Sequence, residues 1–362
     1  MGRDNSNLLD VCQAVPAYLP HQSLLDHLGQ AITDGKAATY TDISGIAPLR
    51  ESLAGDINSR YQCNISAQHI SITAGCNQGF CSAIDTLCEP GDEVIAALPC
   101  YFNHEMWFRI RGINVQWLDF NEATAVPHPQ QVARKISSRT KAIVLVSPNN
   151  PTGAIYSPEV LGEFYRIAKS HNIALVVDET YRDFMDPDAP PHHLFNESDW
   201  ETNFIHLYSF SKSFSLTGHR VGAVAAGPKF LAEMGKIQDC VAISAPHTGQ
   251  IAALYGLKNL IDWRTENGRK MTARAVAITQ AFDHPGLDYQ LISAGAYFAY
   301  IEHPFDSSSH AVAKRLAEEF DVLCLPGTYF GKGQDRYLRF AFANLTESHF
   351  PRLIDHLIQS QI

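Results

Sequence analysis

The chain has 362 residues, of which 45% are hydrophobic and 18% are charged. This composition is typical of a globular protein with one large domain and a smaller one. The formal net charge is −10, and the charged residues are dispersed, which argues against a nucleic-acid partner or an acidic membrane surface. No apolar run is long enough to span a membrane, and "MGRDNSNLLD" lacks the apolar core of a signal peptide.

The eight cysteines form no C-x-x-C pair and no cluster with histidine. Such clusters are the usual sequence sign of a metal site, so we expect no metal ion. Several of the cysteines lie in apolar runs, as buried thiols do in a reducing compartment. We therefore expect a cytoplasmic protein.

Short apolar runs alternate with amphipathic stretches up to about residue 230. Residues 69–80, "HISITAGCNQGF", predict a strand, a tight turn and a helix, and 158–170 predicts a further helix. The other runs that predict strands are 92–102, 114–120, 142–153, 173–181, 203–214 and 220–227. Near-continuous apolar runs of this length are typical of strands buried on both faces of a mostly parallel sheet. The sequence therefore predicts an α/β fold.

After residue 230 the pattern changes to long helical stretches and the runs "AYFAYIEH", "DVLCLPG" and "YLRFAFA". This pattern indicates a smaller α+β domain. The first thirty or so residues are too few to form a domain and are expected to pack with it. We therefore predict a large domain at 34–245 and a small domain built from 1–33 and 246–362.

Loops that leave the carboxyl ends of parallel strands are where ligands bind in such sheets. In "TAGCNQGF", Gly75, Cys76 and Asn77 lie at a strand-to-helix turn, where free backbone N–H groups favour a phosphate. The turn lacks the G-x-G-x-x-G spacing and the GK[ST] ending of nucleotide-binding loops. Other polar or aromatic residues expected at this edge are Tyr101, Asn150, Asp178, Tyr181 and Lys212.

Lys212 lies in "SFSKSFSLTGHR", a stretch without a carboxylate that follows the apolar run "NFIHLY". Desolvation lowers the pKa of an ammonium, and a neutral lysine is a nucleophile toward carbonyl carbon. A lysine that reaches solvent from a loop is the alternative. Asp178 ends the run "ALVV", so its carboxylate needs a partner such as a protonated pyridine nitrogen, unless it is a helix N-cap. Arg220 can share a phosphate with nearby serines or form a surface ion pair.

Together these segments resemble the class I/II aminotransferase family of fold-type I pyridoxal-phosphate (PLP) enzymes. The resemblance is carried by "YTDISGIAPLRESLA", "PCYFNH", "SPNNPTG", "DETY", "SFSKSFSLTGHRVG" and "YLRFAFA", in this order over nearly the whole chain. It implies the fold-type I architecture, with a mostly parallel sheet flanked by helices and a smaller α+β domain. It also implies an aminotransferase that uses PLP and moves an amino group from an L-amino acid to a 2-oxo acid.

The resemblance assigns a role to each matching residue. Lys212 would form the internal aldimine with PLP and shuttle a proton, and Asp178 would hold the proton of the pyridine nitrogen. Tyr181 and Asn150 would contact the phenolic oxygen of the cofactor, and Tyr101 would stack on its ring. The phosphate would be held by Gly75, Cys76, Asn77, Ser209, Ser211 and Arg220. Tyr40 would reach the phosphate from the neighbouring subunit of a homodimer.

Arg339 resembles the arginine that binds the substrate α-carboxylate, a task for which its two-pronged guanidinium is suited. Ala14 stands where the family usually has glycine beside that carboxylate, and its methyl group would narrow the pocket or tilt its entrance. We expect a bulky neutral or aromatic substrate side chain. The aromatic residues that could line its pocket are His104, Trp107, Tyr329 and Phe330, and core packing is the alternative for each of them.

The same cofactor contacts also fit a PLP-dependent lyase, such as a C–S β-lyase, a decarboxylase or an enzyme like aminocyclopropane-carboxylate synthase. Motifs that bind the cofactor do not separate these reactions. A ligand-sensing regulator on this fold would need an additional DNA-binding domain, and the chain has no basic helix for one.

Overall fold

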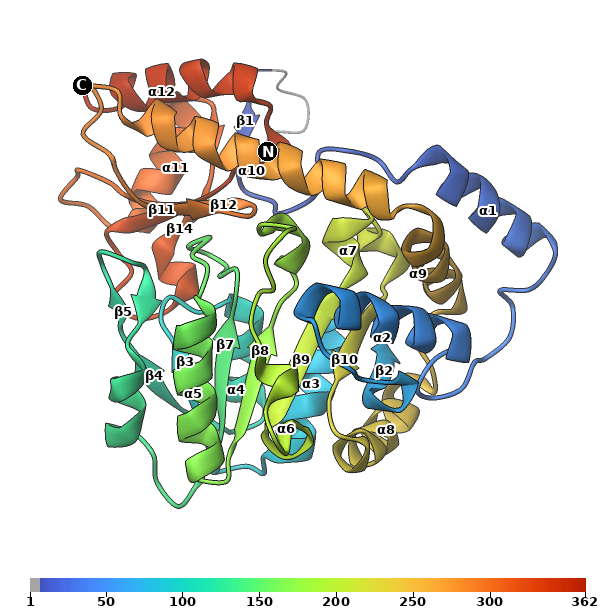
Figure 1. Cartoon of the computed structure of the whole chain (residues 1–362). Helices are drawn as coiled ribbons and strands as arrows, with labels where there is room; N and C mark the ends of the chain where they lie inside the picture. The colour runs from blue at the N-terminus through green and yellow to red at the C-terminus, as the bar shows by residue number, and fades with distance from the viewer. Residues whose placement is uncertain (1–6) are drawn as a thin grey trace.

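The computed structural model describes residues 7–362 and shows two packed units (Figure 1). The larger unit is built on a seven-stranded sheet in the order β2-β10-β9-β8-β7-β3-β4. Strand β10 runs antiparallel to both neighbours, and the other adjacent pairs are parallel. The strands are β2 (Ile70–Thr73), β3 (Glu93–Ala97), β4 (Asn114–Leu118), β7 (Thr140–Val146), β8 (Ala174–Asp178), β9 (Phe204–Ser209) and β10 (Gly222–Ala225).

Both faces of this sheet are covered by helices, which explains why its strands are apolar without alternation. In β7, Ile143 and Leu145 face one core, and Ala142 and Val144 face the other. The first core is closed by α1 (Gln22–Thr33), α2 (Ala47–Tyr61), α5 (Pro158–Ser170) and α9 (His247–Asn259). The second is closed by α3 (Cys76–Leu87), α4 (Phe102–Ile110) and α8 (Pro228–Ala242). The predicted α/β fold is confirmed.

The smaller unit contains a four-stranded antiparallel sheet in the order β11-β12-β15-β14. Its core also includes residues of three helices. The elements are β11 (Gln290–Gly295), β12 (Phe298–Glu302), β14 (Leu325–Pro326), β15 (Tyr337–Ala341), α10 (Ile261–Phe282), α11 (Ser309–Glu319) and α12 (Phe350–Gln359). The remaining short elements are β1 (Leu9–Asp10), β5 (Phe120–Asn121), β6 (Val126–Pro127), β13 (Val322–Leu323), α6 (Trp200–Asn203) and α7 (Phe210–Ser213).

Two helices, α1 and α9, pack with a different unit from the one that the sequence predicts. Residues 1–6 lie outside the described residues, and β1 pairs with β13 of the smaller unit. Helix α1, however, buries Leu24 and Leu28 in the core of the large sheet, beside α9. Both helices were expected in the small domain. Their apolar faces are complementary to each other and to α2, and this contact places them with the larger unit.

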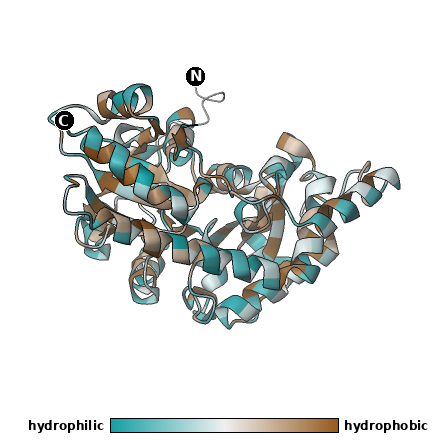
Figure 2. Ribbon diagram, turned by 90° about the horizontal axis from the view of Figure 1, so that it is seen from above, coloured by the Kyte–Doolittle hydropathy of each residue, from teal (hydrophilic) through white to brown (hydrophobic). Residues whose placement is uncertain are grey.

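The helices that cover the sheet have one apolar face each. Figure 2 shows hydrophobic and hydrophilic residues alternating along the outer helices, as expected when one face of each helix is buried. Within residues 7–362, no helix is both long enough and apolar enough to cross a bilayer. The carboxyl edge of the large sheet, where its parallel strands end, faces the smaller unit (Figure 1).

Because α1 buries its apolar face in the large core, shortening that face should destabilise the protein. Leu24 is fully buried, whereas Ile32 on the same helix is 57% exposed. We predict that Leu24→Ala lowers the free energy of unfolding by about 2–5 kcal/mol, whereas the control Ile32→Ala changes it by less than about 0.5 kcal/mol. Urea denaturation at fixed protein concentration measures both. Equal midpoints for the two variants would show that α1 is not part of this core.

Candidate active site

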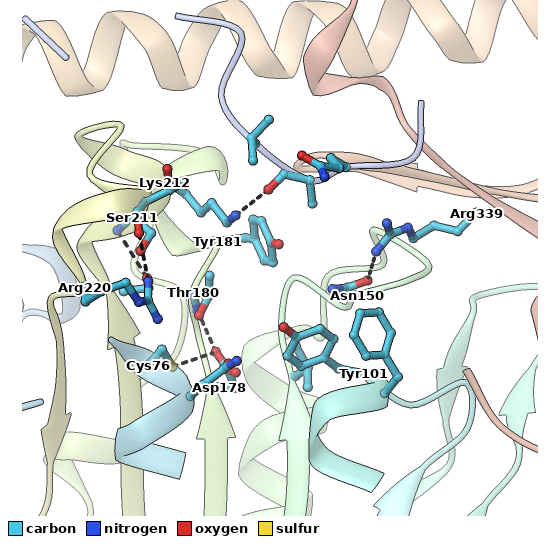
Figure 3. A pocket seen from close by; sticks show the side chains of 18 residues that line it. Cys76, Tyr101, Asn150, Asp178, Thr180, Tyr181, Ser211, Lys212, Arg220 and Arg339 are labelled. Carbon is cyan, nitrogen blue, oxygen red and sulfur yellow. Dashed lines mark hydrogen bonds between the residues drawn. The ribbon is translucent and has the colours of Figure 1, made fainter. Parts of the chain in front are cut away.

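A cavity of about 350 Å³ lies at the carboxyl edge of the large sheet, beside the smaller unit (Figure 3). It brings together most of the residues that the sequence singled out. Those that line it are Ala14, Cys76, Asn77, Tyr101, Asn150, Asp178, Tyr181, Ser209, Ser211, Lys212, Arg220 and Arg339. They come together because β7, β8 and β9 end side by side and α3 begins directly after β2.

Lys212 lies on the short helix α7, directly after β9. Its amine donates a hydrogen bond to the Ala14 carbonyl oxygen, which comes from the N-terminal segment (Figure 3). Burial and, to a smaller extent, the nearby charges of Arg339 and Arg220 together lower the pKa of Lys212 to about 8. The amine is therefore partly neutral near physiological pH, and the loop alternative is not what the structure shows.

The N-terminal segment holds Lys212 in place from the other side. The Tyr18 hydroxyl donates to the Lys212 carbonyl oxygen at 3.0 Å, and the Ser215 hydroxyl donates to the Tyr18 carbonyl oxygen at 2.7 Å. Tyr18, far from Lys212 in the chain, thus holds the backbone of the lysine and is itself held by Ser215. Sequence reasoning assigned no role to Tyr18, because its spacing from the motifs carries no signal.

Asp178 ends β8 and is almost completely buried beneath the cavity. Its Oδ1 accepts a hydrogen bond from the Thr180 backbone N–H at 2.9 Å, and its Oδ2 lies 3.4 Å from Nε2 of His104. Burial alone would raise the pKa of Asp178, but His104 and Thr180 outweigh it and lower the pKa. No helix begins at Asp178, so its carboxylate is an ionised group available to a cationic ligand rather than a helix N-cap.

From the sequence, His104 and Trp107 could line the substrate pocket or pack in the core. Neither of them lines the cavity. His104 is buried, stacks on Phe80 with ring centroids 3.7 Å apart, and contacts Asp178 from below. The Trp107 indole packs in the core between α4 and α3 and donates to Asp85. Both side chains extend from α4, which covers one face of the sheet, into the core on that face. His104 is thus a partner of Asp178 that sequence spacing alone did not reveal.

One end of the cavity is suited to an anion. Gly75 precedes α3 with a positive φ of 87°, so the free N–H groups of the first turn of α3 face the cavity. A Cβ on Gly75 would lie 2.3 Å from Nη2 of Arg220, so only glycine lets this guanidinium approach the turn. Ser209, Ser211 and Thr217 line the same end. This donor set matches a phosphate group.

Arg339 lies on β15 at the other side of the cavity (Figure 3). Its Nη1 donates to Oδ1 of Asn150 at 3.0 Å, and its Nη2 donates to the Cys12 carbonyl oxygen. The guanidinium packs between the rings of Phe298 and Phe330, 5.0 and 5.1 Å from their centroids. The Nε of Arg339 has no hydrogen-bond partner among the described residues, and burial lowers the pKa of the Arg339 guanidinium. A buried arginine with uncharged partners is a site for a carboxylate.

Two tyrosines form walls of the cavity. Tyr101 precedes α4, and its hydroxyl accepts a hydrogen bond from the Asn103 amide at 2.8 Å. Burial raises the pKa of the Tyr181 phenol well above its ordinary value. Lining residues that the sequence did not single out are Gln13, Val15, Phe102, Val146, Thr180 and Thr217. Gln13, Val15, Phe102 and Thr180 are chain neighbours of predicted residues, which is the signal that could have identified them, whereas Val146 and Thr217 are not.

Three of the expected residues lie elsewhere. Tyr40 is 77% exposed and outside the cavity of its own chain, and Tyr329 is 49% exposed. Phe330 is buried against Arg339 rather than open to the cavity. Within residues 7–362, no group of histidine, cysteine or acidic side chains is arranged to hold a metal ion.

Comparison with known proteins agrees with this geometry. The chain belongs to the class I and II aminotransferase family, whose model matches residues 6–357. It is 28% identical over 350 residues to an aromatic aminotransferase of Arabidopsis thaliana, covering 94% of this chain and 86% of that protein. It is 29% identical over 313 residues to an aspartate aminotransferase of Pyrococcus horikoshii, covering 85% and 79% of the two chains.

The solved structure of a double mutant of Thermus thermophilus aspartate aminotransferase superposes on the chain with a TM-score of 0.89. That match has 25% sequence identity and covers 97% of this chain and 91% of the other. The protein is therefore a PLP-dependent aminotransferase with the fold-type I architecture. The lyase alternative loses its support, since the family and these relatives are aminotransferases.

The cavity fits PLP on its own chemistry. It has a phosphate-binding end at α3, an ionised and buried carboxylate at Asp178, an aromatic wall at Tyr101 and a partly neutral amine at Lys212. These four features match the phosphate, the ring nitrogen, the ring face and the aldehyde of the cofactor.

Removing the charge of Asp178 should abolish most turnover without unfolding the protein. We predict that Asp178→Asn lowers kcat by about 100-fold or more, because an amide cannot hold a proton on a ring nitrogen. The matched control is Asp85→Asn, whose carboxylate pairs with Arg111 outside the cavity. Steady-state kinetics and circular dichroism of both variants provide the test, and near-normal turnover in Asp178→Asn would remove this role.

Proposed function

We propose that this aminotransferase acts on L-amino acids with a bulky neutral or aromatic side chain and passes the amino group to a 2-oxo acid. The observation that carries the proposal is the distribution of positive charge in the cavity. Among the described lining residues the cations are Lys212, Arg220 and Arg339. The first lies at the reaction centre, the second at the phosphate end and the third at the carboxylate end.

A substrate with a second carboxylate would find no further guanidinium among these lining residues. The lining of the cavity also includes the apolar side chains of Val15, Phe102 and Val146. Apolar surface is suited to a neutral side chain, because an unpaired carboxylate placed there would lose its hydration. Ala14 also lines the cavity, with its carbonyl oxygen at the Lys212 amine, and its methyl group takes up space that a glycine would leave free.

When bound, PLP supplies an aldehyde that bonds to amines and a protonated ring that withdraws electrons from the substrate Cα. The residues of the chain do the rest. The Nζ of Lys212, partly neutral at its lowered pKa, would accept the proton of the substrate Cα and hold it for return. Asp178 holds the proton of the ring nitrogen, supported by His104 and Thr180. The serine and arginine groups at α3 anchor the phosphate.

Arg339 would orient the substrate through two parallel hydrogen bonds to its α-carboxylate. The carbonyl of Cys12, which accepts from Nη2, would be displaced by a carboxylate oxygen, while the Asn150 contact can stay. Tyr181 and Asn150 would contact the phenolic oxygen of the cofactor, and Tyr101 would lie along its ring. These assignments rest on the resemblance to the family, and the presence of each side chain in the lining of the cavity supports them.

We also propose a homodimer in which Tyr40 completes the site of the partner subunit. The segment that carries Tyr40 is held firmly: Thr41 N–H donates to Ser244 Oγ at 3.3 Å, and Gln250 donates to Thr41 Oγ1 at 2.9 Å. The Tyr40 ring is nonetheless 77% exposed. A large aromatic side chain on a fixed, exposed segment is suited to an interface.

All eight cysteines have free thiols, which supports a cytoplasmic location.

Replacing the two-pronged guanidinium of Arg339 by an ammonium group of the same charge should weaken the binding of both substrates. We predict that Arg339→Lys raises KM for the amino acid and for the oxo acid and lowers kcat/KM by about ten- to a hundredfold. The control is Arg336→Lys, an exposed residue beside the same strand that pairs with Glu302. Kinetics with phenylalanine and aspartate as amino donors also test the substrate class. Unchanged KM values, or a preference for aspartate, would contradict the proposal.

The shared site has a direct test in mixed dimers. Lys212→Ala is expected to be inactive and Tyr40→Phe to be impaired. If Tyr40 acts across the interface, a heterodimer of the two variants contains one site with both residues intact, because the defects fall together in the other site. Unfolding and refolding the two proteins together should then restore activity above that of either variant alone. No recovery, with heterodimers confirmed by mass spectrometry, would place Tyr40 outside the partner site.

A further inference from the structure

A second cavity, of about 330 Å³, lies away from the active site between α2, α9 and α10. Figure 1 shows the amino-terminal end of α10 above α2 at this place. The residues that line the cavity are Ser52, Asp56, Ser59, Arg60, Asp183, Met185, Pro187, Leu257, Ile261, Arg264, Thr265, Gly268 and Arg269. Nothing in the transamination chemistry requires it.

The two carboxylates in this cavity are already neutralised. Asp56 accepts hydrogen bonds from Arg264 at 2.6 Å and from the fully buried Arg182. Asp183 accepts from the Tyr208 hydroxyl at 2.7 Å and lies 3.6 Å from Nη1 of Arg264. Two arginines and two carboxylates thus form one closed network, and the charges of that network balance.

Two further arginines are left without a carboxylate. Arg60 donates to the backbone carbonyl oxygens of Pro187 and Ala189 at 2.8 and 2.9 Å, and Arg269 is exposed at the cavity. Across residues 7–362, neither of them forms an ion pair. Asp186 and Asp188 flank Pro187 in the chain, but neither of these aspartates lines the cavity. The charged residues that line the cavity, three arginines and two aspartates, therefore carry a net charge of +1. The buried Arg182, which pairs with Asp56 but does not line the cavity, raises the total of the cluster to +2.

The remaining polar groups of the cavity are suited to an anion as well. Ser52, Ser59 and Thr265 contribute hydroxyl groups that can donate hydrogen bonds. Guanidinium groups bind phosphate oxygens through paired hydrogen bonds, and hydroxyls on the same surface add further donors. We propose that this cavity is a binding site for a phosphate dianion, either free or as a phosphate monoester.

Such a ligand would contact both units of the protein. Arg60 lies on α2, which packs in the core of the large sheet, and Arg269 lies on α10, which packs in the core of the smaller unit. A dianion held between them would bind the folded protein and not the unfolded chain, so it would stabilise the protein by mass action.

The test uses the PLP-loaded enzyme, in which the cofactor fills the phosphate end of the active site. Isothermal titration calorimetry and thermal unfolding would be measured with inorganic phosphate and with glycerol phosphate, against chloride at equal ionic strength. The variants are Arg60→Gln, Arg269→Gln and the two combined. The matched control is Lys270→Gln, an exposed neighbour of Arg269 that pairs with Glu266.

We expect saturable binding and a raised melting temperature for the wild type and for Lys270→Gln, with affinity at least about tenfold weaker in the combined variant. Binding of both probes would indicate a site for phosphate groups in general, and binding of inorganic phosphate alone would indicate the free ion. Equal affinity in the combined variant and the control would overturn the proposal. So would the lack of saturable binding of either probe to the wild type.

Discussion

The structure depends on the burial of one amine without a carboxylate partner. Lys212 lies between two guanidinium groups, Arg339 and Arg220, and donates only to a backbone carbonyl oxygen. Desolvation and like charge both disfavour its ammonium form, and the pKa falls to about 8. A buried amine of this kind lowers the stability of the fold, and we propose that it is kept because it reacts with the carbonyl carbon of the cofactor.

The rest of the site can be understood as the surroundings that such an amine requires. The parallel strands bring Asp178 and Ser209 to one edge, the smaller unit supplies Arg339, and the N-terminal segment covers the lysine through Ala14 and Tyr18. Charge is separated along the cavity, with the buried carboxylate of Asp178 below and the two guanidinium groups at the ends (Figure 3). This separation gives each ionised part of a cofactor and a substrate one place to bind.

The sequence was sufficient for the sheet and for most of the lining residues, because short apolar runs followed by polar residues mark the ends of buried strands. It was not sufficient where the direction of a side chain decides. His104 and Trp107 follow Tyr101 closely, yet α4 turns both toward the core. The placement of α1 with α9 also depended on a contact between segments far apart in the chain, which local patterning does not encode.

The central claim is that the amine of Lys212 is the attachment point of the cofactor. The most direct measurement is to reduce the PLP-loaded enzyme with borohydride, digest it, and locate the pyridoxyl group by mass spectrometry. We predict that the group is found on Lys212 and that Lys212→Ala carries none after the same treatment. Stable labelling of a different lysine in the wild-type enzyme would contradict it.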